Sequence, residues 1–564
     1  MLANRNIAPN DIYHYLHTTD EDILNPLLLD NMLQGAQLLI SHISQQHKIF
    51  MQVDSDTDGY TSAATLINYL NSIFPGFTQN YISYRLHDDK SHGLILETIP
   101  EDVHLVIAPD SSSNDYEVHK ALKERGIDVL VLDHHEADMV SEYACVINNQ
   151  LCDYPNKTLS GVGVVYKFCS FLDSLLNINN AEQFADLVAL GEIADMMLLT
   201  NFETKRIMDI GLNNITNPYF RGMTIKNEFS LKGNITPFGV AFYIAPYVNA
   251  VTRCGTDEEK MILFEAMLDH KAYELVPSTK RGFKGTFEPR VERACRECGN
   301  IKNRQAKARD ISLETIKTMI EEERLLDNKI LIVRLPESLA LERTLTGLVA
   351  NKIANDYQRP TLILNETLDE NGNKIWSGSG RNYNNCALRH LRKFIDESGY
   401  AIFAQGHEGA FGVAFTPENV QAFINYSNTQ LADFDFTPKY RIDLIYNGSI
   451  LKEDDVFSIA NFDGLWGQGL EEPYILIENV DITNNNISLL NDKVLKIIIS
   501  GYNTDITIIK FNSSPEEFER LHTDHGKVSL NIIGKFQKNI WNNNVYPQIL
   551  IEDYEILSQQ KYYF

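Results

Sequence analysis

An apolar run that ends abruptly in carboxylates is the feature that most constrains this sequence. Residues Ile49–Val53 are followed by Asp54, Asp56 and Asp58, and then by Gly59. The run is typical of a buried strand, so the carboxylates would gather at the carboxyl end of that strand. Ionised carboxylates this close together repel one another, and a bound cation relieves the repulsion. The segment therefore predicts a strand that delivers a metal site.

Two simpler structures could carry the same acidic segment. A calcium loop of the EF-hand type has carboxylates at these alternate positions, but it also requires a closing glutamate at its twelfth position. That position is Thr65, and the residues before the loop are β-branched and aromatic where an amphipathic helix would be needed. The pattern excludes such a calcium loop and leaves a solvated acidic turn as the alternative.

Between residues 49 and 200, short apolar runs alternate with amphipathic stretches, which predicts an α/β domain with a parallel sheet. The expected strands are Ile49–Val53, Asn80–Tyr84, His104–Ala108, Val129–Leu132 and Cys145–Asn148. The expected helices are Ser62–Ser72, Asp115–Glu124, Gly163–Leu176 and Ala181–Leu190. Sheets of this kind bind ligands at the carboxyl ends of their strands.

Three further segments place acids or histidines where apolar stretches end. Asp110 follows one predicted strand, Asp133, His134 and His135 follow another, and Asp195 ends a third apolar stretch. We expect these groups to converge with the first acidic segment on one edge of the sheet. Five or six carboxylates and imidazoles suit two Mn²⁺ ions, or Mg²⁺ with less imidazole, about 3.5–4 Å apart. A site of this kind hydrolyses phosphate esters.

Length and composition limit the class of protein. A chain of 564 residues exceeds what one hydrophobic core serves, so we expect about three domains. No stretch approaches the ~18 apolar residues of a membrane span and the N-terminus lacks a signal-peptide core, so we expect a cytoplasmic protein without membrane contact. The seven cysteines include one CxxC, Cys295–Cys298, without a second pair nearby, which favours structural thiols in a reducing compartment over a zinc site.

One basic segment stands out from the net charge of −26. Residues 280–309 carry ten lysines and arginines against the three acids Glu288, Glu292 and Glu297. A charge run of this kind is usually a solvated helix face, but this one opposes the bias of the whole chain. We therefore expect the segment to contact a phosphate backbone.

The last 125 or so residues contain short β-rich runs separated by Asn, Gly and Asp. This spacing predicts a small β-barrel. Phe536, Trp541 and Tyr546 lie in or beside these runs. Each could stack on a nucleic-acid base or belong to the core of the barrel.

The four acidic segments resemble the signature motifs of the DHH phosphoesterase superfamily, and most closely those of its RecJ branch of single-strand DNA exonucleases. Residues 30–36, 159–167 and 244–253 also resemble RecJ segments, and residues 345–352, 378–381 and 406–408 resemble the DHHA1 domain. The resemblance implies a parallel-sheet DHH catalytic domain over 1–215, a helical basic connector over 216–330, an α/β DHHA1 domain over 331–435 and an OB-like barrel that binds nucleic acid over 436–564.

The resemblance also implies roles for individual residues. The metal ligands would be Asp54, Asp56, Asp58, Asp110, His134 and Asp195, with two Mn²⁺ ions, or Mg²⁺ in their place, and Asp110 as the bridge. Asp54 is the least certain ligand of its segment. Asp110, His134 and His135 would be catalytic, and Asp133 would orient the ligands. Substrate phosphates would be met by Arg85, Arg253, Ser379, Arg381 and His407.

The function implied by the resemblance is metal-dependent hydrolysis of single-stranded DNA to mononucleotides, from 5′ to 3′, in repair, recombination or replication. We expect a monomer that works beside a single-strand-binding protein or a helicase. The alternatives are a phosphodiesterase for oligoribonucleotides or cyclic dinucleotides, and a non-catalytic replication scaffold. Two departures from the family pattern, Ser111–Ser113 after the second motif and His92 in place of a typical tyrosine, bear on the phosphate pocket and on substrate preference.

Overall fold

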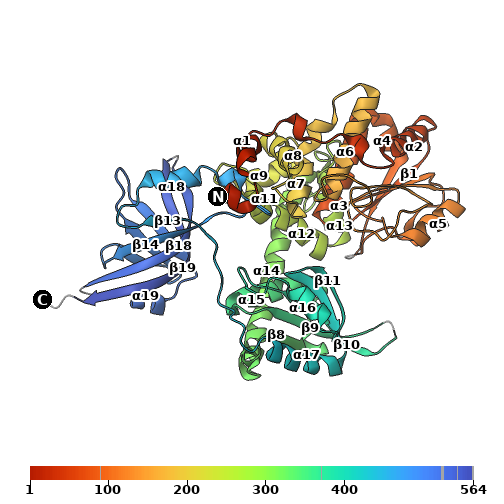
Figure 1. The fold of residues 1–564 in the computed structure, drawn as a ribbon. Helices are drawn as coiled ribbons and strands as arrows, with labels where there is room; N and C mark the ends of the chain where they lie inside the picture. The colour runs from red at the N-terminus through yellow and green to blue at the C-terminus, as the bar shows by residue number, and fades with distance from the viewer. Residues whose placement is uncertain (89–90, 370, 523–525, 543, 562–564) are drawn as a thin grey trace. The chain divides into compact units, whose positions relative to one another are not determined.

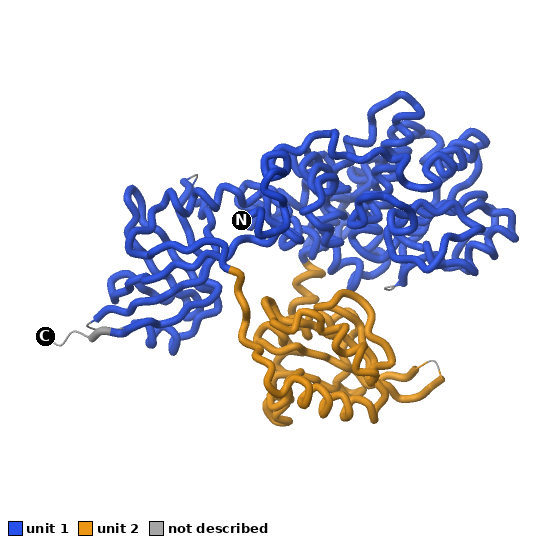
Figure 2. Tube along the Cα trace, in the orientation of Figure 1, with its two compact units in different colours: residues 1–299, 442–564 blue, residues 300–441 orange. Residues whose placement is uncertain are grey.

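The computed structural model describes residues 1–88, 91–369, 371–522, 526–542 and 544–561 (Figure 1). The chain forms two compact units, one of residues 1–299 with 442–564 and the other of residues 300–441 (Figure 2). The finer division into four domains, with boundaries after 215, 330 and 435, stays a prediction. Residues 562–564, the last of the predicted fourth domain, lie outside the described part of the chain.

The first sheet is parallel throughout, with the strand order β2-β1-β3-β4-β5. Its strands are β1 (Ile49–Val53), β2 (Ile82–Leu86), β3 (Leu105–Pro109), β4 (Asp128–Asp133) and β5 (Cys145–Asn148). Strands β1 and β3 are buried at every position, which explains why they read as continuous apolar runs. The order reverses direction at β1 and β3, and such a switch point opens a crevice at the carboxyl ends of the strands.

Helices α3 (Thr57–Ile73), α6 (Gly161–Leu176) and α7 (Ala185–Ala194) pack against one another next to this sheet. Most residues of all three are buried. The other helices of this unit that lie before residue 290 are α1 (Ile12–Leu16), α2 (Met32–Ser44), α4 (Pro75–Tyr81), α5 (Tyr116–Glu124), α8 (Phe202–Asn213), α9 (Pro218–Lys226), α10 (Glu228–Leu231), α11 (Pro237–Tyr243), α12 (Ala245–Cys254) and α13 (Asp257–Ala266).

A short antiparallel hairpin of β6 (Leu275–Pro277) and β7 (Phe287–Pro289) precedes the 33-residue helix α14 (Arg290–Glu322). The division between the two units falls within α14. No helix in the described part of the chain is both long and apolar enough to cross a membrane.

The second unit is built around a five-stranded sheet of order β11-β12-β10-β9-β8, in which only the β8–β9 pair is parallel. The sheet is buried on both faces, because Leu362 and Leu364 of β9 belong to one core cluster while Ile363 belongs to the other. The elements are β8 (Leu331–Leu335), α15 (Arg343–Tyr357), β9 (Thr361–Leu368), β10 (Lys374–Arg381), α16 (Leu391–Glu397), β11 (Ala401–His407), β12 (Ala410–Phe415) and α17 (Pro417–Gln430).

The C-terminal residues form a seven-stranded mixed sheet of order β13-β14-β18-β19-β17-β16-β15. Its elements are β13 (Ile442–Asn447), α18 (Glu453–Ala460), β14 (Tyr474–Ile482), β15 (Ile487–Leu490), β16 (Val494–Ile499), β17 (Ile506–Phe511), α19 (Pro515–Leu521), β18 (Gly526–Trp541) and β19 (Asn544–Lys561). Alternate residues of these strands make one hydrophobic core. The predicted α/β class, with a parallel sheet first and a β-rich end, is confirmed.

Candidate metal centre

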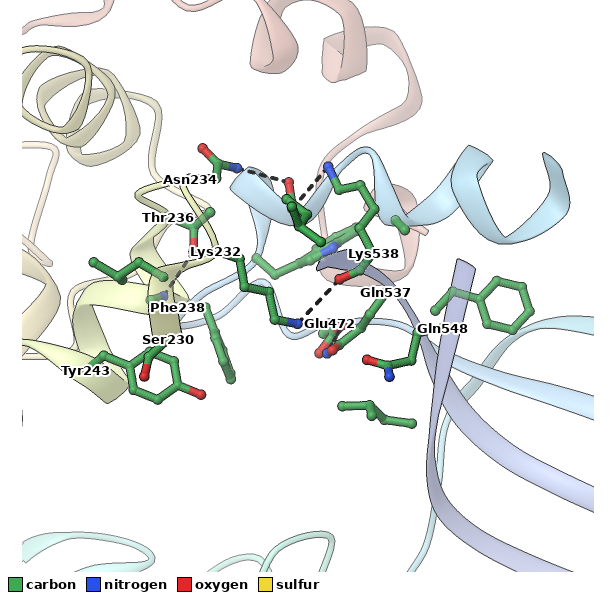
Figure 3. Close-up of a pocket in the computed structure, with 18 of the residues that line it drawn as sticks. Ser230, Lys232, Asn234, Thr236, Phe238, Tyr243, Glu472, Gln537, Lys538 and Gln548 are labelled. Atoms are coloured by element: carbon green, nitrogen blue, oxygen red, sulfur yellow. Dashed lines mark hydrogen bonds and ion pairs between the residues drawn. The ribbon is translucent and has the colours of Figure 1, made fainter. Parts of the chain in front are cut away.

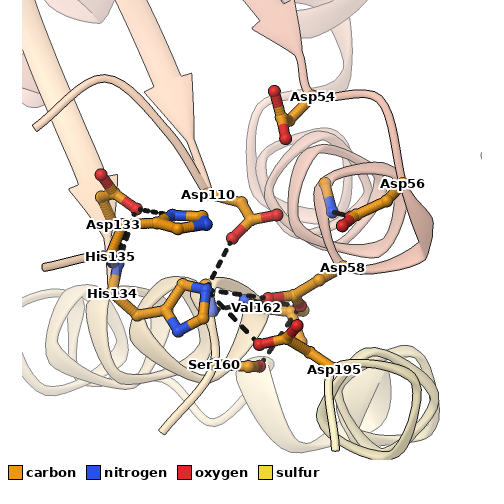
Figure 4. Close-up of polar contacts among 12 residues, drawn as sticks. Asp54, Asp56, Asp58, Asp110, Asp133, His134, His135, Ser160, Val162 and Asp195 are labelled. Carbon is orange, nitrogen blue, oxygen red and sulfur yellow. Dashed lines mark hydrogen bonds and ion pairs between the residues drawn. The ribbon is translucent and has the colours of Figure 1, made fainter. Parts of the chain in front are cut away.

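The residues predicted to bind metal come together at the carboxyl edge of the parallel sheet (Figure 4). Asp54 directly follows β1, Asp110 follows β3 and His134 follows β4. Asp56 caps the N-terminus of α3, where its side chain accepts a hydrogen bond of 3.0 Å from the Gly59 amide. The remaining two ligands belong to helices, because Asp58 lies in the first turn of α3 and Asp195 is the C-terminal cap of α7.

One nitrogen atom faces three carboxylates in this cluster. Nε2 of His134 lies 3.2 Å from Oδ1 of Asp110, 3.5 Å from Oδ2 of Asp195 and 3.8 Å from Oδ2 of Asp58. Three groups each bring their ligand atoms within 4.8 Å of one another, and neighbouring groups share Asp110 or His134. The groups are Asp54 with Asp56 and Asp110, Asp58 with His134 and Asp195, and Asp110 with His134 and His135.

Two buried carboxylate oxygens indicate whether these residues could hold a cation. Oδ1 of Asp54 and Oδ1 of Asp110 make no hydrogen bond among the described residues, although both side chains are almost fully buried. A buried carboxylate oxygen that accepts no hydrogen bond is costly, and a metal ion would satisfy it. Carboxylates with one imidazole are the donors that Mn²⁺ and Mg²⁺ accept. The donor set therefore fits a divalent cation.

Burial and mutual repulsion shift the pKa values of the cluster in the direction expected of an ion site. Burial, followed by the charges of Asp58 and Asp56, raises the pKa of the Asp195 carboxyl to about 8. The pKa of Asp110 is also raised by burial and then by Asp58. Burial lowers the pKa of His134, so its imidazole is neutral, as a metal ligand must be. A cation at this place would keep the carboxyls ionised.

Asp58 is held by the start of helix α6. Its carboxylate accepts hydrogen bonds from the amides of Gly161 at 2.7 Å and Val162 at 3.1 Å, and from the Ser160 hydroxyl at 3.2 Å. A side chain at position 161 would have its Cβ 2.2 Å from Oδ1 of Asp110, so glycine is required by close approach. Sequence analysis matched this segment to RecJ proteins without giving it a role, although a serine before glycine at a helix start is a capping signal.

Asp133 holds the histidine pair in place. One oxygen of its buried carboxylate accepts hydrogen bonds from the amides of His134 at 2.7 Å and His135 at 3.2 Å, and from Nδ1 of His135 at 2.8 Å. The other oxygen accepts a bond of 2.9 Å from the Ser113 amide. Burial lowers the pKa of His135, but the bond to Asp133 outweighs it and raises that pKa to about 9. These contacts support the predicted orienting role of Asp133, and Ser113 takes part in them.

His92, noted in the sequence only as a departure, lies against the first metal-binding segment. Its Nδ1 is 2.6 Å from Oδ2 of Asp54, and Nε2 of His87 is 3.7 Å from the other oxygen. Sequence reasoning missed both histidines because the expected strand ended at Tyr84, whereas β2 ends at Leu86 and is directly followed by His87. His92 lies a few residues further along the chain. Asp54 is thus hydrogen-bonded to one imidazole and faces a second, as well as Asp56 and Asp110.

The predicted phosphate-binding residues occur in both units. Arg85 is in β2, where it pairs with Asp88 at 2.8 Å, and Arg253 is exposed near the end of α12. In the second unit, Ser379 and Arg381 lie on β10 and His407 ends β11. Arg381 and His407 both pair with Ala410 of the intervening strand β12, so the register sets them on either side of one residue.

The basic segment 280–309 was predicted to contact a phosphate backbone, but three of its arginines are engaged within the protein. Arg290 and Arg293 are buried, and each forms ion pairs with two glutamates. Arg296 pairs with the buried Glu288 at 2.5 Å. Carboxylates of the same chain neutralise these arginines, so the expected phosphate contact is wrong for them.

The three C-terminal aromatic residues differ in burial. Phe536 is 2% exposed and belongs to the core of the sheet, so it is not a stacking residue. Trp541 and Tyr546 are 59% and 38% exposed near the end of the β18–β19 hairpin, and stacking stays a prediction for them. A cavity of about 370 Å³ lies between this sheet and helices α10 and α11, with Phe238, Tyr243 and Phe536 in its lining (Figure 3). No residue of the carboxylate cluster lines it.

Comparison with known proteins assigns the family. The model of the DHH family, N-terminal domain, matches residues 48–192, and that of the RecJ OB domain matches residues 442–553. The chain is 37% identical over 560 residues to YorK of Bacillus subtilis, described as a prophage-derived single-strand DNA-specific exonuclease, covering 99% of this chain and 95% of YorK. It is 26% identical to RecJ of the same organism, covering 96% of this chain and 65% of that protein.

A solved structure agrees with these matches at the level of fold. The crystal structure of Thermus thermophilus RecJ in complex with Mn²⁺ superposes with a TM-score of 0.68 at 20% identity, covering 98% of this chain and 77% of that one. The motifs, the two domain matches and a relative that is similar over almost its whole length agree with one another. The chain therefore belongs to the RecJ branch of the DHH family.

Proposed function

We propose that this protein is a metal-dependent exonuclease that hydrolyses phosphodiester bonds of single-stranded DNA, from 5′ to 3′, to mononucleotides. The observation that carries the proposal is the cluster in which Nε2 of His134 faces the carboxylates of Asp58, Asp110 and Asp195. Membership of the RecJ branch supports the substrate class. The direction of attack is part of the proposal and rests on the resemblance to RecJ. DNA repair, recombination or replication is the setting we infer.

The residues of the cluster would hold two divalent cations, Mn²⁺ or Mg²⁺. Asp54, Asp56 and Asp110 suit one ion, and Asp58, His134 and Asp195 suit the other. Asp110 of the first group lies 3.2 Å from His134 of the second, so it is the proposed bridge. When bound, such ions increase the acidity of the attacking water and offset the charge that gathers on the phosphate. Asp133 and the amides at the start of α6 keep the ligands oriented before the substrate arrives.

Other side chains would bind the phosphates. His135 is half exposed and carries a positive charge at neutral pH, because Asp133 raises its pKa to about 9. It suits a non-bridging phosphate oxygen beside the ions. Arg85, Arg253, Ser379, Arg381 and His407 are the proposed contacts to the remainder of the strand.

The proposal extends to the setting in which the enzyme works. We infer a monomer in the cytoplasm that receives its strand from a single-strand-binding protein or a helicase. Association with either partner would be visible as co-elution of the purified proteins on a sizing column.

The test is digestion of single strands labelled at the 5′ or the 3′ end, with Mn²⁺, by the parent and by Asp110→Asn, which keeps the size of the side chain but removes its charge. We expect the parent to release a labelled mononucleotide from the 5′-labelled strand first and the variant to be nearly inactive. Unchanged activity in the variant would refute the two-ion centre. Early release from the 3′-labelled strand would refute the direction.

A dinucleotide and a cyclic dinucleotide, assayed beside the long strand, distinguish the small-substrate phosphodiesterase. A preference for either would exclude the exonuclease. A protein that binds single strands without cleaving any substrate would instead be the scaffold.

A further inference from the structure

The β6–β7 hairpin, residues 275–289, has one buried side and one exposed apolar side. Val276 and Glu288 face each other in the strand register and are buried. On the other side, Leu275 is 67% exposed and Phe287 is 65% exposed. A two-stranded hairpin this short is not stable by itself, so the contacts of its buried side must hold it.

Helix α14 and the hairpin itself supply those contacts. The Glu288 carboxylate accepts hydrogen bonds from Ser278 at 2.8 Å and Arg296 at 2.5 Å, and pairs with Lys280 at 2.9 Å. Arg293 donates to the Pro277 carbonyl at 3.1 Å. The base of the hairpin is thus fixed by charged hydrogen bonds.

The tip of the hairpin is open and cationic. Phe283 is 56% exposed, and Arg281 and Lys284 are exposed with no ion pair to an acid among the described residues. A side chain added at Gly282 or Gly285 would meet no atom within 4 Å. The chain as a whole carries a net charge of −26, so two unpaired cations beside exposed aromatic rings are a local exception.

We propose that the β6–β7 hairpin is an accessory binding arm for the single-stranded substrate, in which Phe283 and Phe287 stack on bases while Arg281 and Lys284 contact phosphates. The inference rests on the proposed function and extends it to a surface outside the metal centre. A single strand offers free base faces and phosphates together, whereas a duplex hides its base faces. Exposed aromatic rings with adjacent cations match that pair of features.

Fluorescence anisotropy of a labelled oligothymidine strand, titrated with the full-length protein, tests the stacking contacts. The titration is done in EDTA, where no cleavage occurs. We expect Phe283→Ala with Phe287→Ala to weaken binding at least about fivefold. Phe283→Trp should retain affinity, and Tyr13→Ala, which removes a ring that is 75% exposed elsewhere, is the matched control. Unchanged affinity in the double variant would overturn the proposal and leave the surface to a protein partner.

The phosphate part is tested by salt dependence. Each phosphate contact to a single strand contributes about 0.7 to the slope of log K against log salt concentration, so Arg281→Ala with Lys284→Ala should lower that slope by about 1.4. An unchanged slope would remove these two cations from the interface. If the hairpin variants bind and degrade single strands as the parent does, only the hairpin proposal fails; if the parent degrades none, the proposed function fails.

Discussion

The imidazole of His134 and the carboxylate of Asp110 are held 3.2 Å apart by the ends of two neighbouring parallel strands. Strands β3 and β4 pair up to Pro109 and Leu132, so Asp110 comes opposite Asp133, and His134 is one residue further along. The sheet register therefore brings the two segments together, and the hydrogen bond from the His134 amide to Asp133 holds the turn that carries the imidazole. Predictions about each ligand follow from this rigidity.

Replacing His134 with alanine should abolish most of the activity without unfolding the protein. The change removes the nitrogen that faces three carboxylates, and the loss of several kcal/mol of transition-state stabilisation corresponds to about a thousandfold in rate. The steady-state rate at which parent and variant degrade a labelled single strand measures this loss. His17→Ala, at an exposed histidine outside the cluster, should leave the rate unchanged.

The substitution Asp133→Asn should lower activity by about 10- to 100-fold, which is typical of groups that orient metal ligands. The amide replaces a carboxylate that accepts four hydrogen bonds, three of them from the histidine pair. A titration of activity against Mn²⁺ should show a higher concentration at half-maximal rate. If that concentration and the maximal rate are those of the parent, Asp133 has no orienting role.

Mn²⁺ should raise the melting temperature of the parent protein, and EDTA should reverse the effect. An ion that binds only the folded chain stabilises it by about 2.7 kcal/mol at a concentration 100 times its Kd. Asp110→Asn should lose most of this stabilisation, because Asp110 belongs to two of the three ligand groups. Calorimetry in both conditions provides the measurement, and equal shifts for the two proteins would argue against Asp110 as a shared ligand.

Phe536 and Trp541 should respond differently to truncation. Phe536→Ala opens a cavity in the core of the C-terminal sheet and should destabilise the protein by about 3–5 kcal/mol. Trp541→Ala removes a ring that is 59% exposed, so the melting temperature should stay the same while affinity for single strands falls. Thermal unfolding and anisotropy together separate the two effects. A stable Phe536→Ala protein would contradict the core assignment.

Stability should fall as the pH drops below about 6.5, in part because of His119. This side chain is buried, and burial lowers its pKa, although Asp115 opposes the shift. In the interval between the lowered pKa and the ordinary value, the unfolded chain takes up a proton that the folded chain does not. The contribution is at most about 1.4 kcal/mol per pH unit. Melting temperatures at pH 7.5 and 5.5 should therefore differ less in His119→Gln than in the parent.

Much of the catalytic sheet could be predicted from the sequence, because buried parallel strands are continuous apolar runs with defined ends. Strands β1 and β5 lie exactly where they were expected, but β2 begins at Ile82 and not at Asn80. Helix α4, which starts at Pro75, takes up the residues before it. Helix α3 begins five residues earlier than expected, at Thr57, because Asp56 caps it.

The residues of the candidate site that follow strands could be predicted from the sequence. The contacts between residues far apart in the sequence could not. Six predicted ligands gather in one cluster. The hydrogen bonds from Ser160 and Gly161 to Asp58 join residues more than 100 positions apart, which no local pattern reveals. The prediction for the basic segment failed for a related reason. Arg290 pairs with Glu265 and Glu274, and both glutamates precede the segment in the sequence.

The backbone at Asp110 changes what its presence in the chain signifies. Its φ of 66° lies in the left-handed region, which Asp, Asn and Gly tolerate far better than other residues. A descendant that had lost all catalysis would still be penalised for most substitutions at this position. Asp195, which has a φ of −88°, is under no such constraint, so its carboxylate is the more informative sign that a chain of this fold remains an enzyme.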